Sequence, residues 1–434
     1  MNRVVITGLG AVSPLGNTFE ESWTAAKSGK SGIGPITKFD VSDIPWKVSG
    51  ELKGFNAYPY LTGKELRRLD PFIHYAVAAS IMAVEDAGLL QMRPDKGPGK
   101  RDITDPYFHE AAHVYLASGG VVIGSSRGGI STIEKAFAKD RRPGLNRSRL
   151  SSVSAYLMPA TTISMASSYV AQKLGIKGYC LGISNACASG TSSIGEAYRL
   201  IRAGFKGPVL TGGSEAPVCR LCVEGYGISG ALSETADISA SRPFDKTRDG
   251  FVIAEGACVM VLENMENALG RGSKIYGEII GYANTVDALH QTRPDGEGEA
   301  RAFMSAIVDA GLKPADIDYI SSHGTATPLG DRVESEALEK VFEERVSAVP
   351  VSAVKSMTGH MLAASGAIET AFTIMSIKEG IIPPTINLTE KDRACAVNVI
   401  TEMTETEIGI ALSSSFGFGG INAVIVLRGF PESE

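Results

Sequence analysis

Residues 183–191 read Ile183-Ser184-Asn185-Ala186-Cys187-Ala188-Ser189-Gly190-Thr191, and the fold can be worked out from this stretch. The short run before it, Tyr179–Ile183, has the composition of a strand. Apolar residues follow it at helical spacing, at Ile194, Ala197, Leu200 and Ile201. A strand therefore ends and a helix begins next to Cys187, which is the repeating unit of α/β proteins.

The same alternation recurs along the chain. Further strands are predicted at Arg3–Thr7, Gly120–Ile123, Pro208–Thr211, Ala257–Leu262, Lys274–Gly281, Asp318–Ser322, Val349–Ala353, Ile408–Leu412 and Ala423–Leu427. Helices are predicted at Lys64–Ala87, Thr162–Leu174, Ser189–Ala203, Ala300–Ala310, Arg332–Phe342 and Met361–Lys378. Several are followed by a capping glycine, namely Gly88, Gly175, Gly204, Gly311 and Gly380. We expect βα units on a largely parallel sheet.

Both halves of the chain contain a short strand that runs into a turn rich in Ser, Gly and Ala and then into a helix, once near residue 187 and again near residues 323 and 360. This echo predicts two topologically similar lobes, residues 1–265 and 266–434. The segment 92–119 breaks the alternation, and its polar stretch 94–102, rich in Pro and Gly, predicts a surface insertion in the first lobe.

The composition excludes several classes of protein. With 434 residues, of which 44% are hydrophobic and 21% charged, the chain can bury a large core. A net charge of −6 gives no footprint for nucleic acid or anionic lipid. No apolar run is long enough for a membrane helix and no targeting segment is visible, so we expect a cytoplasmic protein. Six cysteines are too few for a disulfide framework, so free thiols are expected.

Cys187 has the sequence context of a nucleophile. It falls at or just before a helix N-terminus, where free N–H groups and the helix dipole favour a thiolate, and its small neighbours leave room for a substrate. The alternative is a buried structural cysteine that acts as a small hydrophobe. The local sequence leaves both interpretations open.

Two histidines stand in similar turns. His323 follows a strand directly in Ser322-His323-Gly324-Thr325, at the sheet edge where α/β proteins bind ligands. His360 lies between a strand and a helix, five residues after Lys355. A lone histidine at a strand end is more often structural, but three separate turns with reactive side chains favour a shared site.

The glycine-rich loop Ser415-Phe416-Gly417-Phe418-Gly419-Gly420-Ile421-Asn422 runs from strand to strand. Phosphate-binding loops run from strand to helix, so a nucleotide site is disfavoured. By itself the loop is best interpreted as a structural hairpin, although a backbone N–H in it could serve as an oxyanion donor.

Two further motifs resemble metal or redox sites. His109-Glu110-Ala111-Ala112-His113 matches the spacing of a zinc peptidase but lies in the irregular insertion, with little room for the long helix that such a site needs. Cys219-Arg220-Leu221-Cys222 has no second pair, which favours two ordinary thiols on a helix. We therefore expect no metal site.

Five motifs in collinear order, from residue 3 to about residue 427, together resemble one family. They are the opening residues 4–16 and the stretches around Cys187, His323, Lys355 with His360, and Phe416–Asn422, with Arg242–Asp245 and Asp249–Phe251 also in place. The chain resembles the β-ketoacyl-acyl carrier protein synthases of the condensing-enzyme superfamily, above all the synthase II type and the ketosynthases of type II polyketide systems. The resemblance implies a thiolase-like fold, with two similar lobes in a five-layered α-β-α-β-α arrangement.

The resemblance also implies a reaction and the residues that perform it. Cys187 would take an acyl group from a carrier-protein thioester, and malonyl-carrier protein would then lose CO₂ and attack that group. His323 and His360 would donate N–H bonds to the developing enolate oxygen. Lys355 would form a charged network with Asp331 and Glu369.

Other matching positions concern the substrate. By resemblance, the backbone N–H groups of Cys187 and Phe418 would form an oxyanion hole, and Phe251 and Phe418 would be aromatic gates. Thr325 and Thr327 match positions that bind the pantetheine arm.

Three features depart from the family pattern. Arg127 stands where the synthase II type carries an apolar residue, at a position expected to reach the partner subunit's acyl pocket, so we expect a shorter pocket or a polar acyl end, since a buried unpaired guanidinium is costly. Tyr226 lines the same pocket and brings a hydroxyl that needs a partner. The insertion 92–119 has no counterpart in the family.

The implied partners are acyl carrier protein, whose 4'-phosphopantetheine carries the substrates, and a second subunit, in a homodimer or in a heterodimer with a related ketosynthase subunit. No metal or redox cofactor is expected. A non-catalytic chain-length factor would share the fold but typically lacks the cysteine. A thiolase would normally carry a second reactive cysteine, where this chain has His360.

Overall fold

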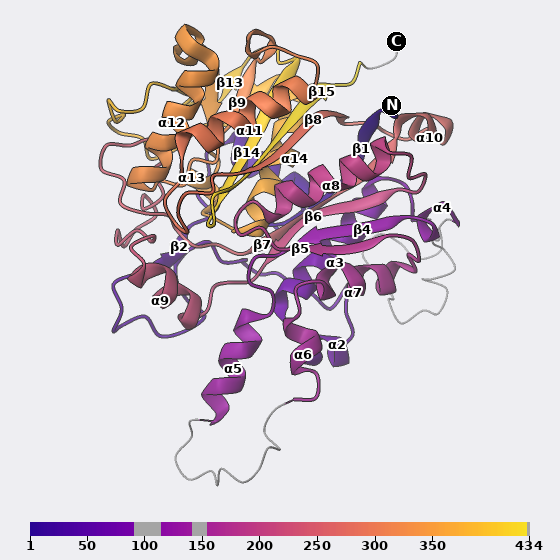
Figure 1. Ribbon diagram of the computed structural model, residues 1–434. Helices are drawn as coiled ribbons and strands as arrows, with labels where there is room; N and C mark the ends of the chain where they lie inside the picture. The colour runs from indigo at the N-terminus through magenta and orange to yellow at the C-terminus, as the bar shows by residue number, and fades with distance from the viewer. Residues whose placement is uncertain (91–113, 141–153, 432–434) are drawn as a thin grey trace.

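The computed structural model describes residues 1–90, 114–140 and 154–431 and is built around one sheet of eleven strands (Figure 1). Five of the strands come from the first half of the chain: β1 (Val4–Val12), β4 (Gly120–Gly124), β5 (Cys180–Ile183), β6 (Val209–Glu215) and β7 (Gly256–Asn264). Six come from the second half: β8 (Gly277–Val286), β9 (Tyr319–Ser321), β10 (Pro350–Ser352), β12 (Asn398–Val399), β14 (Ile410–Gly417) and β15 (Ile421–Gly429). Two short hairpin pairs lie outside this sheet: β2 (Gly34–Pro35) with β3 (Val48–Ser49), and β11 (Ile381–Ile382) with β13 (Thr404–Glu405).

The two halves of the sheet repeat one strand order. Across the first half the order is β5-β4-β6-β7-β1, and across the second it is β10-β9-β14-β15-β8, with β12 added at the edge. In each half the strands therefore lie in the order third, second, fourth, fifth, first along the chain. The halves join where Val4–Ile6 of β1 pairs antiparallel with Gly277–Ile279 of β8. The predicted pair of similar lobes is confirmed by this repetition.

The expectation of a largely parallel sheet is wrong, because only the outer strands of each half are parallel. The pairs β5-β4-β6 and β12-β10-β9-β14 are parallel, whereas β6-β7-β1-β8-β15-β14 alternate in direction. Only three residues join β14 to β15. A parallel crossover needs a dozen residues or more, so this link forces an antiparallel hairpin.

Helices fill three layers around the sheet halves. In the centre, α8 (Ser189–Arg202) and α14 (Ala363–Glu379) contact each other and strands of both halves. The outer face of the first half is covered by α3 (Pro71–Asp86) and α7 (Met165–Leu174), and that of the second by α11 (Gly296–Asp309) and α12 (Pro328–Phe342). The predicted five-layered α-β-α-β-α arrangement is therefore confirmed.

The remaining helices are short or lie at the periphery. They are α1 (Phe19–Lys27), α2 (Gly63–Arg68), α4 (Val114–Ala117), α5 (Ile130–Asp140), α6 (Leu157–Thr161), α9 (Arg220–Ile228), α10 (Met265–Gly270) and α13 (Lys355–Thr358), with 3₁₀ turns at Pro314–Asp316 and Glu343–Ser347. No helix in the described ranges is long and apolar enough to cross a membrane.

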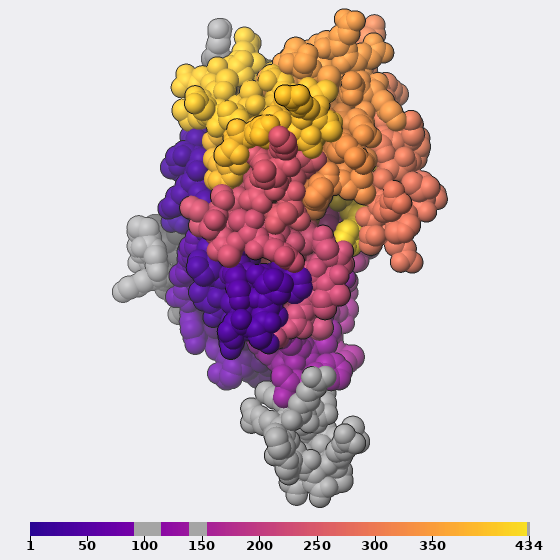
Figure 2. Space-filling view, turned by 90° about the vertical axis from the view of Figure 1, so that its left-hand side faces the viewer, coloured from indigo at the N-terminus to yellow at the C-terminus, as the bar shows by residue number. Residues whose placement is uncertain are grey.

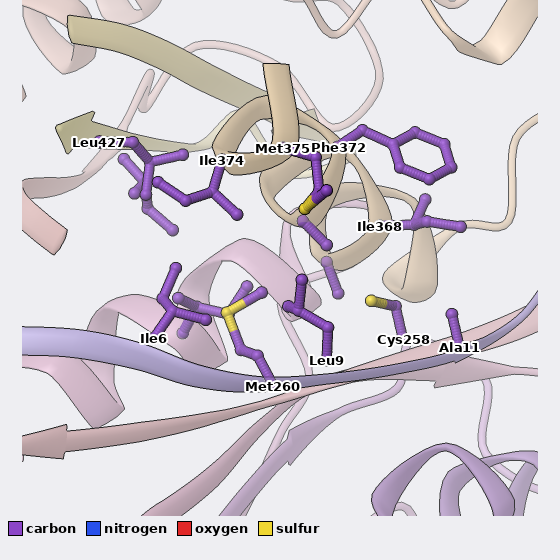
Figure 3. Packing of buried hydrophobic residues seen from close by; sticks show 14 of the residues in the cluster. Ile6, Leu9, Ala11, Cys258, Met260, Ile368, Phe372, Ile374, Met375 and Leu427 are labelled. Atoms are coloured by element: carbon purple, nitrogen blue, oxygen red, sulfur yellow. The ribbon is translucent and has the colours of Figure 1, made fainter. Parts of the chain in front are cut away.

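The apolar core follows the alternation of the strands. On β7, Cys258 and Met260 face the central helices, while Val259 faces the outer helices. In Figure 3, Ile368 and Phe372 of α14 pack over the face of β7 that carries Cys258 and Met260. The two central helices are thus anchored on apolar residues, which fixes the positions of their N-termini.

One local difference from the predicted elements has a clear cause. The helix predicted at Lys64–Ala87 is divided into α2 and α3, because Pro71 starts a new helix whose first turn is capped by Asp70. The predicted glycine caps all have positive φ, between 66° and 113°, at Gly88, Gly175, Gly204, Gly311 and Gly380. Most of the predicted insertion, residues 92–113, lies outside the described residues, and its end forms α4.

Candidate active site

The two central helices touch at their first turns. A Cβ atom on Gly190 of α8 would lie 2.2 Å from the carbonyl oxygen of Ala363, and one on Gly366 of α14 would lie 2.0 Å from the Thr191 hydroxyl. Only glycine permits this approach. It brings the turn that carries Cys187 in the first half against the turn that carries His360 in the second.

A cavity of about 380 Å³ opens at this junction. Its walls hold eight of the twelve predicted site residues: Cys187, Tyr226, Phe251, His323, Thr325, Thr327, His360 and Phe418. In Figure 2 a piece of the yellow C-terminal chain is visible in a hollow between the pink and orange segments. The predicted turns therefore do converge on one site.

Cys187 is held in a strained turn. The residue before it, Ala186, has φ of +48°, which is rare for a residue other than glycine. Burial raises the pKa of the Cys187 thiol to about 11, while the charges of Lys355 and Arg127 and the backbone N–H of Phe418 oppose the rise. The helix-end effect expected from the sequence is outweighed by burial, and the thiol is neutral at rest.

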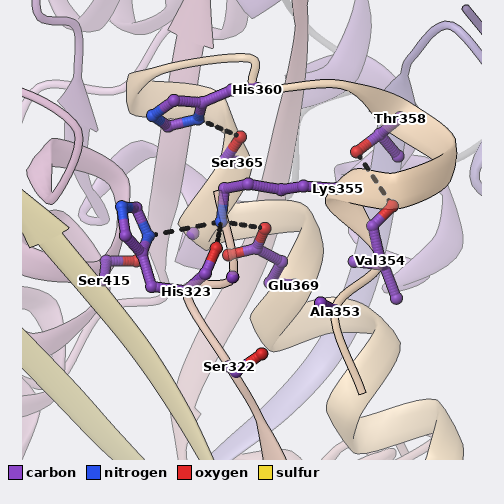
Figure 4. Close-up of polar contacts among 12 residues, drawn as sticks. Ser322, His323, Ala353, Val354, Lys355, Thr358, His360, Ser365, Glu369 and Ser415 are labelled. Carbon is purple, nitrogen blue, oxygen red and sulfur yellow. Dashed lines mark hydrogen bonds and ion pairs between the residues drawn. The ribbon is translucent and has the colours of Figure 1, made fainter. Parts of the chain in front are cut away.

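Lys355 fixes the orientation and tautomer of His323 (Figure 4). Its ammonium donates to the Glu369 carboxylate at 2.6 Å, to the His323 carbonyl oxygen at 2.6 Å and to His323 Nδ1 at 3.3 Å. An ammonium can only donate, so Nδ1 accepts and the ring proton of His323 stands on Nε2. All three ammonium protons are used.

Ser365 fixes the orientation and tautomer of His360. The Ser365 hydroxyl oxygen accepts the backbone N–H of Met361 at 2.8 Å and lies 3.1 Å from His360 Nδ1. The hydroxyl has no other acceptor among the described residues, so its own proton is satisfied only by donation to Nδ1. The proton of the His360 ring therefore also stands on Nε2.

Both imidazoles are neutral. Burial lowers the pKa of His323 and His360 well below the ordinary value, and the charge of Lys355 lowers both further. The two rings lie edge to face, with centroids 5.4 Å apart. The site thus presents two neutral N–H donors beside a thiol.

Asp331 does not join the network of Lys355. Its carboxylate accepts the backbone N–H groups of Phe244 at 2.8 Å and Ala326 at 3.0 Å, and lies 3.6 Å from Arg248. The acid that serves the His323 turn is Glu334, which the sequence reasoning missed.

Glu334 binds the turn through its backbone. Its two oxygens accept the N–H groups of His323 at 2.7 Å and Gly324 at 2.8 Å. Glu334 lies three residues after Asp331 on the same face of α12, and this spacing was the one signal that could have revealed it.

Arg127 and Tyr226 bind each other within one chain. Arg127 Nε donates to the Tyr226 hydroxyl at 2.8 Å, and the guanidinium lies 5.1 Å from the ring centroid. Tyr226 in turn packs against Phe251 and Phe418, with centroids 5.5 and 6.2 Å apart. The hydroxyl of Tyr226 thus has its partner, and Arg127 contacts Tyr226 of its own chain.

The two threonines line the cavity next to the His323 turn. Their hydroxyls lie 3.0 Å apart, and the Thr327 hydroxyl accepts the Gly330 N–H as the cap of α12. The loop 415–422 is the β14–β15 hairpin that its sequence indicated, and its Phe418 reaches the cavity.

The motifs with metal-like spacing form no site in the described residues. Cys219 and Cys222 are buried free thiols at the start of α9. No group of His, Cys, Asp or Glu side chains in residues 1–90, 114–140 and 154–431 could hold a metal ion. The stretch His109–His113 lies outside the described residues.

The chain matches two family models, "Beta-ketoacyl synthase, N-terminal domain" over residues 1–268 and "Beta-ketoacyl synthase, C-terminal domain" over residues 276–389. A relative from Synechocystis sp., named 3-oxoacyl-[acyl-carrier-protein] synthase 2, is 41% identical over 433 residues, which cover 98% of both chains.

Two solved structures are similar along the whole chain. The ishigamide ketosynthase/chain length factor has a TM-score of 0.88 at 32% identity, over 99% of this chain and 100% of that one. A type II polyketide acyl-carrier protein in complex with its ketosynthase bound to the hexaketide has a TM-score of 0.85, again at 32% identity with 99% and 100% coverage. With a cysteine and two neutral histidines meeting at the junction of two like lobes, this chain belongs to the beta-ketoacyl synthase family.

Proposed function

We propose that this chain catalyses a decarboxylative Claisen condensation, in which an acyl group on Cys187 is joined to malonyl-acyl carrier protein to give 3-oxoacyl-acyl carrier protein, in fatty acid or type II polyketide synthesis. The observation that carries the proposal is the pair of neutral imidazoles, each with its proton on Nε2, in one cavity with the thiol. Such a pair suits a negative charge that develops during the reaction.

In the first step Cys187 takes the acyl group. Its sulfur attacks the carbonyl of the acyl-carrier thioester, the bond to the pantetheine sulfur breaks, and that sulfur leaves with the thiol proton. The backbone N–H groups of Cys187 and Phe418 stabilise the oxyanion of the tetrahedral intermediate. The direction of the Phe418 N–H toward the thiol supports this role.

In the second step the malonyl group loses CO₂. The bond to the carboxylate breaks, its electron pair forms an enolate, and His323 and His360 donate to the enolate oxygen through Nε2. The enolate carbon attacks the acyl group, the bond to Cys187 sulfur breaks to release the product, and the leaving thiolate takes up a proton from solvent to restore the neutral thiol. Lys355 with Glu369 positions His323, and Asp331 supports the neighbouring turn from its own cluster.

The remaining residues shape the path of the substrates. Phe251 and Phe418 gate the space beside the thiol, and Thr325 and Thr327 bind the pantetheine arm. Arg127 and Tyr226 bound the acyl pocket. The guanidinium beside Tyr226 favours a short acyl group or one with a polar end over a long alkyl chain.

The proposal extends to partners and location. The protein acts on acyl carrier protein in the cytoplasm, as a homodimer or with a related ketosynthase subunit, and its chemistry needs no metal or redox cofactor. The complex of a similar ketosynthase with its acyl-carrier protein supports the first of these points.

The test is a two-step assay by intact-protein mass spectrometry. Acyl-carrier proteins with short, long and polar-ended acyl groups are offered first, and malonyl-carrier protein second. Cys187→Ala should abolish acylation, whereas His323→Ala and His360→Ala should be acylated and release no 3-oxoacyl product. Acylation of Cys187→Ala, or full condensation by either histidine variant, would overturn the proposal.

A further inference from the structure

Glu299 is a buried acid that the proposed mechanism does not use. It lies on the first turn of α11, is 1% exposed, and contributes to the wall of the cavity that holds Cys187 and both histidines. Its Oε2 is fully buried without a hydrogen-bond partner among the described residues. A buried polar atom without a partner costs free energy, so a ligand that satisfies it gains affinity.

The surroundings of Glu299 keep it neutral. Burial raises the pKa of Glu299 well above the ordinary value, and the charges of Glu334, Asp287, Asp295 and Asp331 raise it further. No basic side chain in the described part of the chain forms an ion pair with it, and no metal-binding group is present there. A neutral carboxyl group can donate one hydrogen bond and accept others, whereas an ionised one can only accept.

The position of Glu299 in the cavity indicates which part of the substrate it contacts. Its acidic neighbour Glu334 binds the backbone of the His323 turn, which continues into Thr325 and Thr327. Glu299 therefore belongs to the second-half wall of the cavity, while Tyr226, which bounds the acyl side, belongs to the first half.

The threonines on this wall are partly engaged with each other and with the backbone. A substrate arm that contains amides presents carbonyl oxygens that need donors and N–H groups that need acceptors. We propose that Glu299, as a neutral acid, hydrogen-bonds an amide of the pantetheine arm and so positions carrier-linked substrates in the cavity. This inference rests on the proposed function, because that function supplies the arm.

Binding of free pantetheine tests the contact without any acyl chemistry. We compare the dissociation constants of the wild type, Glu299→Ala, Glu299→Gln and Glu297→Ala by calorimetry. Glu297 is a matched control, because it lies two residues away on the same helix but is exposed and paired with Lys340. Glu299→Ala should bind pantetheine about tenfold more weakly, as the loss of one hydrogen bond predicts. Glu299→Gln, which keeps a donor and an acceptor, and Glu297→Ala should stay within about twofold of the wild type.

Acylation of Cys187 gives the second readout. An acyl-pantetheine and the same acyl group as an ethyl thioester, which has no amide, are offered to each variant. Glu299→Ala should raise KM for the first with little change in kcat and leave the second unchanged. Equal binding of pantetheine by Glu299→Ala and the wild type would overturn the inference, as would a loss in Glu299→Gln as large as in Glu299→Ala. Failure of every protein to acylate Cys187 would instead refute the proposed function, while the binding data still decide the role of Glu299.

Discussion

The two halves of this molecule share a strand order and hold their turns with similar hydrogen bonds, although Glu215 ends β6 and Glu334 lies on α12, yet they supply different chemistry. In the first half, Glu215 accepts the backbone N–H groups of Ser126 at 2.7 Å and Arg127 at 3.0 Å, after the second strand of that half. In the second half, Glu334 does the same for the turn of His323.

The turns before the central helices correspond as well. The Ser189 hydroxyl accepts the N–H of Asn185 and the Ser365 hydroxyl accepts that of Met361, both at 2.8 Å and both from four residues back. The first of these turns carries a thiol and the second an imidazole. One scaffold used twice thus gives a thiol on one side of the junction and N–H donors on the other, and the proposed condensation needs both.

Among the described residues, the buried ion pair of Lys355 and Glu369 lies next to the histidine turn of the second half, and no such pair lies next to the Cys187 turn of the first. Lys355→Met should leave the Glu369 carboxylate buried and unpaired, at a cost of about 3–5 kcal/mol in the free energy of unfolding. Condensation should be lost, because His323 Nδ1 loses its donor. Urea unfolding and the two-step assay measure both effects.

The double variant Lys355→Met with Glu369→Leu separates the two effects. Removing both charges should restore most of the stability and none of the condensation. If the single variant were as stable as the wild type, the ion pair would not be what distinguishes the second half.

The halves should also respond differently to pH. Burial raises the pKa of Cys187 to about 11, so its alkylation by iodoacetamide should rise about tenfold per pH unit from pH 7 toward 10. The pKa values of His323 and His360 lie well below the ordinary value, so both stay neutral as the pH falls from 8 to about 6. Condensation by enzyme acylated in advance should therefore be flat over that range. A step near pH 6.5 would show that one imidazole titrates normally.

Glu215 and Glu334 allow the same substitution to be compared in the two halves. In Glu215→Gln and Glu334→Gln the amide NH₂ faces a backbone N–H that it cannot accept, which should cost each variant about 1–3 kcal/mol of stability. The two variants should slow different steps of the reaction. Glu215→Gln should slow acylation, and Glu334→Gln should slow condensation. Single-turnover mass spectrometry follows each step, and equal slowing of both steps in both variants would contradict the division.

The sequence predicted the reactive turns well because each is marked by a local pattern. Cys187 and His323 follow a strand, and His360 lies between a strand and a long helix, all three among small residues, and the fold brings these segments together. Strand direction was mispredicted, because periodicity records which face is buried and not which way a strand runs. The prediction that Asp331 joins the network of Lys355 was wrong. The position of a residue on a helix indicates which turn its side chain lies near, but not which atoms it binds. Glu299 looked like any solvated acid on an amphipathic helix, and Glu334 differed only by its spacing from Asp331. Their burial in the folded chain is what sets both apart.

The smallest and sharpest comparison is between the two turn serines. Ser365→Ala removes the acceptor of the Met361 N–H and the donor to His360 Nδ1, so the ring proton is no longer held on Nε2. The loss of the bond to His360 predicts about a tenfold fall in condensation, and the loss of both hydrogen bonds predicts about 1–3 kcal/mol in stability, with acylation unchanged. Ser189→Ala should cost similar stability but slow acylation instead, because its turn carries Cys187. Condensation of a single-turnover acyl-enzyme measures the first effect and the rate of acylation the second. If Ser189→Ala and Ser365→Ala slowed the same step, the two turns would not act as separate parts of the site.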